Sequence, residues 1–262
     1  MKIRTLASLT AASALLLTAC GGSGGGGDNP DGIDLVQDGT LTVCGEAPYE
    51  PFEMEDKSAP SGYTGFDVEI TEQVAKKMGL KYVYKDTAFD SLQSGLALNS
   101  GECDLGASAM TITEDRKKNL LFTDGYYDSK QSLLVAEGSD IKTKDDLKGK
   151  TVGIQTGSTG EIYAKENLDG AELKSFPGDA ELWQAIQAGQ VDAVLQDLPV
   201  NIPHTKDGKF AIVEEYDTGE QYGFAAKKGN DKLIEEFNKE LKAMREDGSY
   251  DKLYDKYFST DK

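Results

Sequence analysis

The stretch GFDVEITEQVAKKMGLKYVY, residues 65–84, decides the fold of this chain. Apolar residues recur four apart along its first part, at Phe66, Ile70, Val74 and Met78. This spacing predicts an amphipathic helix with one buried face. Gly79 is a natural end for that helix, because glycine closes helices in the left-handed conformation at little cost. The residues KYVY then predict a strand. A helix that leads directly into a strand is one half of an α/β repeat.

The same alternation extends outward on both sides of this stretch. A short apolar strand is predicted before it at 41–45, and another strand after it at 104–108. Between them, residues 90–98 predict a second helix. Its inward residues are expected to be Leu92, Leu96 and Ala97. The order strand, helix, strand, helix, strand predicts a parallel sheet with helices packed on it.

The pattern restarts in the second half of the chain. Strands are predicted at 132–135, 151–154, 172–175 and 193–195, and helices at 144–147, 158–167 and 179–188. A last strand at 221–226 and helices at 231–246 and 250–258 follow. Beyond the N-terminal segment, about 240 residues remain, which suits an α/β protein of two lobes.

The N-terminal segment is typical of an exported protein. A basic start precedes a small apolar run at 6–17, which is too short to span a membrane as a stable helix. The residues before Cys20 resemble the lipobox of bacterial lipoproteins, and a flexible glycine-rich tether follows. We therefore expect a signal peptide at 1–19 and a lipidated Cys20 with a tether at 20–33. The alternative is an ordinary cleaved signal with a chance cysteine.

The charge of the chain excludes several partners. The formal net charge is −18, and the predicted signal holds two basic residues and no acid, so the mature protein carries about −20. Such a surface repels nucleic acid and anionic lipid. No second apolar run of membrane length is present. We expect an extracytoplasmic monomer, at the cell surface or in a periplasm, attached to the cell membrane only by its lipid.

Cys44 and Cys103 remain once Cys20 is lipidated. An oxidising compartment permits a disulfide between them. Two buried free thiols are the alternative, because cysteine is often a small core residue and strand register can hold the sulfur atoms too far apart. The sequence leaves both interpretations open.

Several motifs occur in order between residues 41 and 258. They are YEPFE at 49–53, GFDV at 65–68, MTITEDRKK at 110–118, FTDGYY at 122–127, DLKGK at 146–150, QTGSTG at 155–160, VDAV at 191–194 and DGSYDK at 247–252. Together they resemble the polar amino-acid family of extracytoplasmic solute-binding proteins, the receptors of ABC importers. The chain resembles the glutamine-binding and the lysine/arginine/histidine-binding members about equally.

The resemblance implies two α/β lobes with the ligand held in a cleft between them. The first lobe would comprise 34–127 plus 222–262, and the second 131–217. Two crossovers, near 127–131 and 218–221, would act as hinges. A protein of this kind captures a small ligand by hinge closure and delivers it to an ABC permease of the membrane.

The resemblance also implies how the common part of an amino acid is held. Arg116 would bind the α-carboxylate through two parallel hydrogen bonds, near a helix N-terminus capped by Thr113. Thr159 would be the matching donor of the second lobe. Asp197 follows a predicted strand at the sheet edge where open α/β proteins bind ligands, and it would receive the α-ammonium. Taken alone, Arg116 and Asp197 are also explained as exposed members of a highly charged surface.

The side-chain end of the implied pocket is polar. Tyr49 and Phe89 would sandwich the ligand side chain, and Glu46, Gln155 and Gln196 would meet its tip. Glu46 is the one acid predicted there, so arginine is the expected ligand and glutamine the second choice, because a cation offsets the cost of burying a carboxylate. The full expected ligand set is Glu46, Tyr49, Phe89, Ser108, Ala109, Thr111, Arg116, Gln155, Thr159, Gln196 and Asp197.

Other classes of function have less support in the sequence. His204 is the only histidine, and its loop is expected to be exposed. No serine has triad-like surroundings and no cluster has zinc spacing, so we expect no catalysis, no metal and no cofactor. Trp183 is expected to pack against its own helix neighbours rather than against ligand. The alternatives are a dehydratase-type enzyme on the same fold and a sensor subunit, which would need a following membrane segment.

Overall fold

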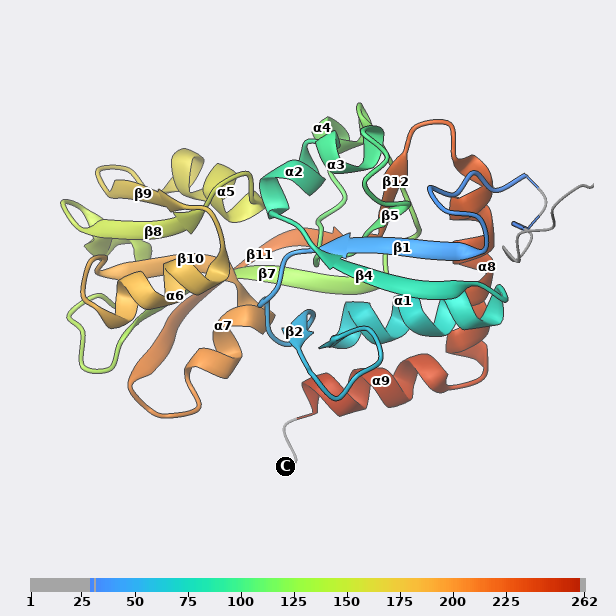
Figure 1. Cartoon of the computed structure of the whole chain (residues 1–262). Coiled ribbons are helices and arrows are strands. Elements are labelled where there is room, and N and C mark those ends of the chain that lie inside the picture. The colour runs from blue at the N-terminus through green and yellow to red at the C-terminus, as the bar shows by residue number, and fades with distance from the viewer. Residues whose placement is uncertain (1–28, 31, 260–262) are drawn as a thin grey trace, which may run out of the picture.

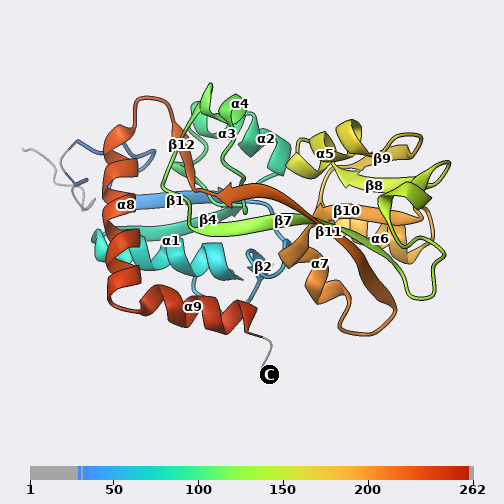
Figure 2. The same cartoon turned by 180° about the vertical axis from the view of Figure 1, so that it is seen from behind.

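The computed structural model describes residues 29, 30 and 32–259; the predicted signal peptide, Cys20 and most of the tether lie outside them. Two five-stranded sheets form the centres of two lobes that lie end to end (Figure 1). Helices cover both sheets (Figure 2). The predicted two-lobed α/β fold is confirmed.

The first sheet is mixed rather than purely parallel. Its strand order is β4 (Lys81–Asp86), β1 (Thr40–Gly45), β5 (Leu105–Gly106), β12 (Ala225–Lys227) and β6 (Leu120–Phe122). The three strands predicted from the first half of the chain are parallel to one another. Only β12 runs in the opposite direction, because it returns from the end of the chain and pairs antiparallel with both β5 and β6.

The large core of the first lobe lies under three helices on one face of this sheet. They are α1 (Phe66–Lys77), α8 (Asp231–Glu246) and α9 (Ser249–Phe258). The amphipathic helix predicted within residues 65–84 is confirmed as α1, and its apolar residues Phe66, Ile70 and Val74 are fully buried. A two-stranded hairpin, β2 (Met54–Glu55) with β3 (Tyr63–Thr64), precedes α1.

The opposite face carries α2 (Phe89–Gln93), α3 (Leu96–Asn99) and α4 (Glu114–Lys117). The prediction of one helix at 90–98 is wrong, because Gly95 adopts a φ of 83° and divides it in two. The break changes the direction of the next side chain, so Leu96 is 66% exposed instead of inward. Beneath these helices Cys44 and Cys103 form a disulfide, with their Cα atoms 5.9 Å apart.

The second sheet has the order β11 (Phe210–Tyr222), β7 (Tyr127–Ala136), β10 (Ala193–Asp197), β8 (Thr151–Gln155) and β9 (Glu172–Phe176). Alternate residues of β7 enter separate cores on the two faces. The helix α5 (Thr159–Asn167) covers one core and α6 (Asp179–Gln187) the other. A 3-10 turn at Lys144–Leu147 and the helix α7 (Leu198–His204) complete the lobe.

The expectation of an exposed loop around His204 is wrong. His204 ends α7, and its side chain is only 14% exposed. The imidazole stacks on the indole of Trp183 with the ring centroids 3.9 Å apart. Trp183 thus packs partly against a residue that is distant in sequence, because α7 lies beside α6.

Two long strands connect the lobes. β7 and β11 pair antiparallel from Tyr127 with Tyr222 to Ala136 with Phe210. The pairing is interrupted between Tyr216 and Glu220, where Gly219 has a φ of 65°. The first half of β11 is not among the predicted strands: its apolar run at 210–213 is followed by acids at 214, 215 and 217, which break the alternation typical of a strand.

Candidate functional site

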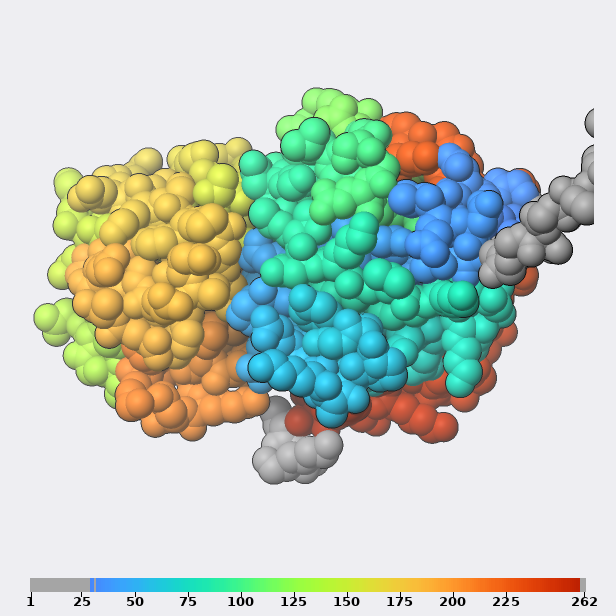
Figure 3. All heavy atoms as spheres, in the orientation of Figure 1, coloured from blue at the N-terminus to red at the C-terminus, as the bar shows by residue number. Residues whose placement is uncertain are grey.

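Most of the expected ligand residues surround one small cavity between the lobes. The lining residues are Glu46, Tyr49, Phe89, Ser108, Ala109, Thr111, Arg116, Gln155, Ser158, Thr159 and Asp197. Of the expected set only Gln196 does not line the cavity, and Ser158 lines it in addition. The two lobes meet along a continuous junction in the space-filling view (Figure 3).

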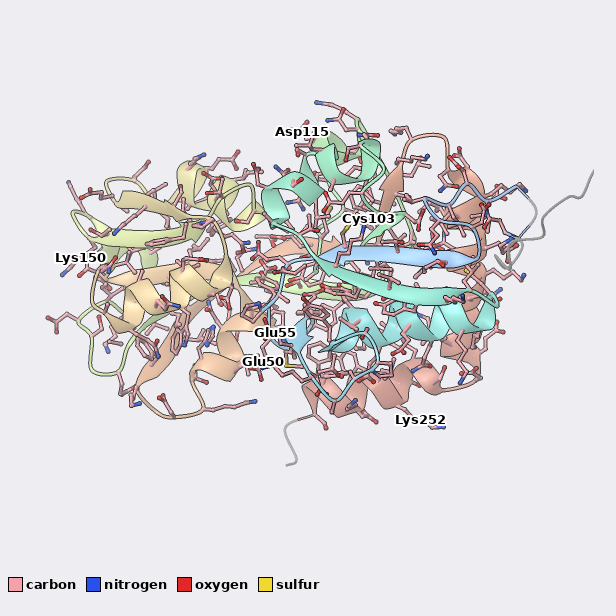
Figure 4. All side chains as sticks on the ribbon, viewed as in Figure 1. Glu50, Glu55, Cys103, Asp115, Lys150 and Lys252 are labelled. Carbon is pink, nitrogen blue, oxygen red and sulfur yellow. A yellow bond between two sulfur atoms is a disulfide. The ribbon has the colours of Figure 1, made fainter. Side chains whose placement is uncertain are left out.

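Local structure places Arg116 inside the cleft. The hydroxyl of Thr113 accepts a hydrogen bond from the Arg116 N–H at 3.1 Å, which is the predicted helix cap. The neighbouring Asp115 points outward (Figure 4), whereas Arg116 is only 6% exposed. Arg116 is therefore not part of an exposed charge run, although its sequence neighbours are.

The guanidinium of Arg116 contacts both lobes. Its Nη1 donates to the carbonyl of Thr111 at 2.8 Å, and its Nη2 donates to the carbonyl of Gly157, in the second lobe, at 3.0 Å. Its central carbon lies 5.2 Å from the ring centroid of Phe89, within cation–π range. Burial lowers the pKa of Arg116 to about 10, so the group remains charged at neutral pH.

Asp197 lies at the end of β10 and is also buried, which excludes an exposed loop aspartate. Its Oδ2 accepts a hydrogen bond from the hydroxyl of Tyr49 at 3.1 Å and another from Tyr222. Burial, and after it the negative charge of Glu220, raises the pKa of Asp197 to about 7. A buried carboxylate of this kind is a favourable partner for an ammonium group, because a nearby cation offsets its desolvation.

Glu220 and Gln131 belong to the site, and sequence reasoning missed both. The Oε2 atom of Glu220 accepts from the hydroxyls of Thr111 at 2.7 Å and Thr159 at 2.6 Å, one from each lobe. Gln131 donates to Asp197 Oδ1 at 2.5 Å and to Glu220 Oε1 at 3.1 Å. Glu220 is one of several acids along β11, and only the pairing of β7 with β11 brings it and Gln131 together.

The acid that lines the far end of the cavity, Glu46, has a second acid close to it outside the lining. Glu46 accepts from the Phe89 N–H at 2.9 Å and from Gln155 Nε2 at 2.9 Å. Gln196 Nε2 donates at 2.8 Å to a second buried carboxylate, Asp179, at the start of α6. Burial, with a smaller contribution from the charge of Asp179, raises the pKa of Glu46 to about 7. Of these two acids, Glu46 alone lines the cavity, and Asp179 lies next to it.

A usable signal for Asp179 was present in the sequence. The residue follows β9, a parallel strand, and open α/β sheets bind ligands at the carboxyl ends of such strands. The same reasoning identified Asp197 after β10. Asp179 differs from Asp197 in that it opens a helix, α6, whose apolar residues also account for the segment.

Direct hydrogen bonds between the lobes define a closed conformation. Tyr49 reaches Asp197, Glu46 reaches Gln155, and Arg116 reaches Gly157 across the cleft. Arg116 and Asp197 line one end of the cavity, with Glu220 hydrogen-bonded to its lining residues, and Glu46 lines the other end, with Asp179 next to it. Within residues 29, 30 and 32–259, no group of three or more His, Cys, Asp or Glu side chains is arranged to hold a metal ion. In the same part of the chain, no helix has the length and apolar character needed to cross a membrane.

The fold and the cleft together define a two-lobed solute-binding protein. Residues 41–260 match the family model of bacterial extracellular solute-binding proteins, family 3. The chain belongs to this family.

Relatives of known name are binding proteins for polar amino acids. A probable histidine-binding protein of Neisseria gonorrhoeae is 33% identical over 263 residues, which cover 97% of this chain and 95% of that protein. The ABC transporter glutamine-binding protein GlnH of Bacillus subtilis is 34% identical over 275 residues, covering 99% and 98%. The structure of an ancestral arginine-binding protein bound to arginine has a TM-score of 0.78 and 41% identity, and covers 84% of this chain and 99% of that one.

Proposed function

We propose that this chain is the extracytoplasmic substrate-binding lipoprotein of an ABC importer and that it binds a polar L-amino acid by closure of its lobes. Arginine is the favoured ligand and glutamine the second. The observation that carries the proposal is the joint presence of Arg116, from the first lobe, and Asp197, from the second, around one buried cavity. A free amino acid carries a carboxylate and an ammonium at fixed separation, which these two groups complement.

Each end of the cavity has a proposed role. Arg116 and the start of α5 at Thr159 hold the α-carboxylate, and Asp197 with Ser108 and Thr111 receives the α-ammonium. Tyr49 and Phe89 enclose the ligand side chain, while Glu46, Gln155 and Gln196 meet its tip. Relatives named for arginine, histidine and glutamine support this class of ligand.

The lobes and the anchor complete the proposal. Residues 34–127 with 222–262 form the first lobe and 131–217 the second, with hinges near 127–131 and 218–221. Lipidated Cys20 holds the mature monomer at the membrane, where it meets its permease. Cys20→Ser should therefore move the protein from the membrane fraction to the soluble fraction. A Cys20→Ser variant that still sediments with membranes contradicts this anchor.

A thermal-shift screen of residues 28–262 against the twenty L-amino acids tests the binding function. A ligand at a hundred times its dissociation constant should add about 2.7 kcal/mol to the free energy of unfolding. Isothermal titration of the best ligand then gives its affinity. No binding of any L-amino acid contradicts the receptor function, and chemical turnover of a bound ligand would favour the dehydratase-type alternative instead.

A further inference from the structure

Asp179 faces Glu46 from the opposite lobe. It begins α6 in the second lobe and is only 5% exposed. Its backbone N–H points at Glu46 Oε1 at 3.4 Å, and its Oδ1 accepts from Gln196 Nε2 at 2.8 Å. Its Oδ2 accepts no hydrogen bond from any residue that the structure describes. The carboxylate is thus fixed through one oxygen, and the other is free to bind a donor.

Asp179 and Glu46 also share a second, outer cavity between the lobes. The acids that line it are Glu46, Asp86, Asp179 and Glu181, and none of the lysines or arginines in the described part of the chain lines it. Glu46 lines both this cavity and the inner one. The two spaces therefore meet at Glu46, beside Asp179.

Few positively charged groups lie near Glu46 and Asp179. The basic group nearest to Asp179 in the described part of the chain is the imidazole of His204, whose Nε2 lies 3.7 Å from Asp179 Oδ1. That imidazole is stacked on Trp183 and carries a charge only when it is protonated. Closing the lobes thus brings two carboxylates together without a permanent cation beside them, which is unfavourable unless a cation joins them.

We propose that Asp179 is a specificity-determining residue, and that a cationic ligand tip is held between the carboxylates of Glu46 and Asp179, one from each lobe. This inference rests on the proposed amino-acid binding function and deepens it. A guanidinium offers five N–H donors in a plane and a full charge, enough for both carboxylates and for the amide oxygens of Gln155 and Gln196. The primary amide of glutamine offers two donors and no charge, so it cannot relieve the repulsion that closure creates.

The test compares arginine with citrulline, which has almost the same shape but an uncharged ureido tip. Isothermal titration of the purified protein would measure both ligands with the unmodified chain, Asp179→Asn and Glu181→Gln. Glu181 lies on the same helix and lines the outer cavity but is exposed, so it is the matched control. Thermal melting without ligand checks that each variant is folded.

We expect Asp179→Asn to lower the affinity for arginine about tenfold or more and to change that for citrulline by less than about twofold. Glu181→Gln should change neither by more than about twofold. An equal loss for both ligands, or no loss for arginine, overturns the role of Asp179 while amino-acid binding stands. Preference of the unmodified protein for citrulline or glutamine over arginine also overturns it. Binding of no amino acid overturns the proposed function itself.

Discussion

The carboxylate of Asp67 holds the backbone of Ala109, because its Oδ2 accepts a hydrogen bond from the Ala109 N–H at 2.9 Å. Ala109 lines the ligand cavity and has a φ of 43°, a left-handed conformation that alanine rarely adopts. Asp67 itself is fully buried and also accepts from the hydroxyl of Tyr126 at 2.6 Å. An acid in the stretch that decides the fold therefore also positions the ligand loop.

Glu53 completes this arrangement. It is fully buried, and burial followed by the charge of Asp67 raises the pKa of Glu53 well above its usual value. Both carboxyl oxygens of Glu53 and the Oδ1 of Asp67 have no other hydrogen-bond partner among the described residues. The raised pKa favours a neutral Glu53 beside Asp67, which keeps the pair at a single negative charge. That charge remains on Asp67, where it strengthens the hydrogen bond to Ala109.

Asp67→Ala should loosen this loop and Glu53→Gln should not. The first change leaves the Ala109 N–H and the Tyr126 hydroxyl without their buried acceptor, and should lower the free energy of unfolding by about 3 kcal/mol. It should also weaken ligand binding. The second change keeps a neutral side chain that donates, and should cost less than about 1 kcal/mol. Urea melts and titration of both variants measure this, and equal losses for the two would contradict the positioning role.

Arg116→Lys should weaken the binding of every amino-acid ligand, whatever its side chain. An ammonium is a point charge and cannot reproduce the two parallel hydrogen bonds of a guanidinium. It also has one nitrogen in place of the two that donate separately to the carbonyls of Thr111 and Gly157. We expect a loss of about 1.5–3 kcal/mol in binding free energy. An unchanged dissociation constant would show that the α-carboxylate is held elsewhere.

Local patterns in the sequence predict most helices and strands. They also predict those site residues whose position follows from a single strand, such as Asp197 at the end of β10. Phe66–Lys77 forms a helix, as the spacing of its apolar residues four apart predicts. The helix predicted at 90–98 is wrong because a single left-handed glycine, Gly95, changes the phase of the side chains that follow. Hydrophobic spacing by itself carries no information on that break.

Gln131 and Glu220 could not be assigned for a different reason. Their roles depend on the register of two strands that are distant in sequence, with an irregularity between Tyr216 and Glu220. Closure then places Thr111 and Thr159 of opposite lobes on the same carboxylate oxygen. These contacts depend on how β7 pairs with β11 and on how the two lobes meet. The order of charged residues along β11 does not predict either of them.

Loss of the disulfide should destabilise the first lobe without removing the ligand contacts. Cys44 and Cys103 are 59 residues apart, and closing a loop of that length in the unfolded chain corresponds to about 4 kcal/mol by the chain-entropy model. Cys44→Ala with Cys103→Ala should lower the free energy of unfolding by about 2–4 kcal/mol. Arginine affinity, measured well below the melting temperature, should change little. A large loss of affinity in a folded variant would contradict the separation of the two roles.

The free energy of unfolding without ligand should fall as pH rises from about 5 to 8. Folding raises the pKa of Glu46 and of Asp197 to about 7 and that of Asp67 to about 6, in each case chiefly through burial. A raised folded-state pKa stabilises the protein fully below the unfolded-state value, and this stabilisation is lost as pH rises through the folded-state value. For Glu46, with an unfolded value of 4.5, the loss approaches about 3 kcal/mol.

Ligand binding should show the opposite trend with pH. An amino acid with a cationic tip favours the ionised forms of Glu46 and Asp197, so arginine affinity should rise between pH 6 and 8 and binding near pH 7 should release protons. Urea melts from pH 5 to 8 measure the first effect. Titrations in buffers of different ionisation enthalpy count the protons. Glu46→Gln should reduce the slope of both profiles, because an amide does not titrate, while the contribution of Asp197 remains. Stability that rises with pH, or proton uptake on binding arginine, would show that these carboxylates are already ionised in the unliganded protein.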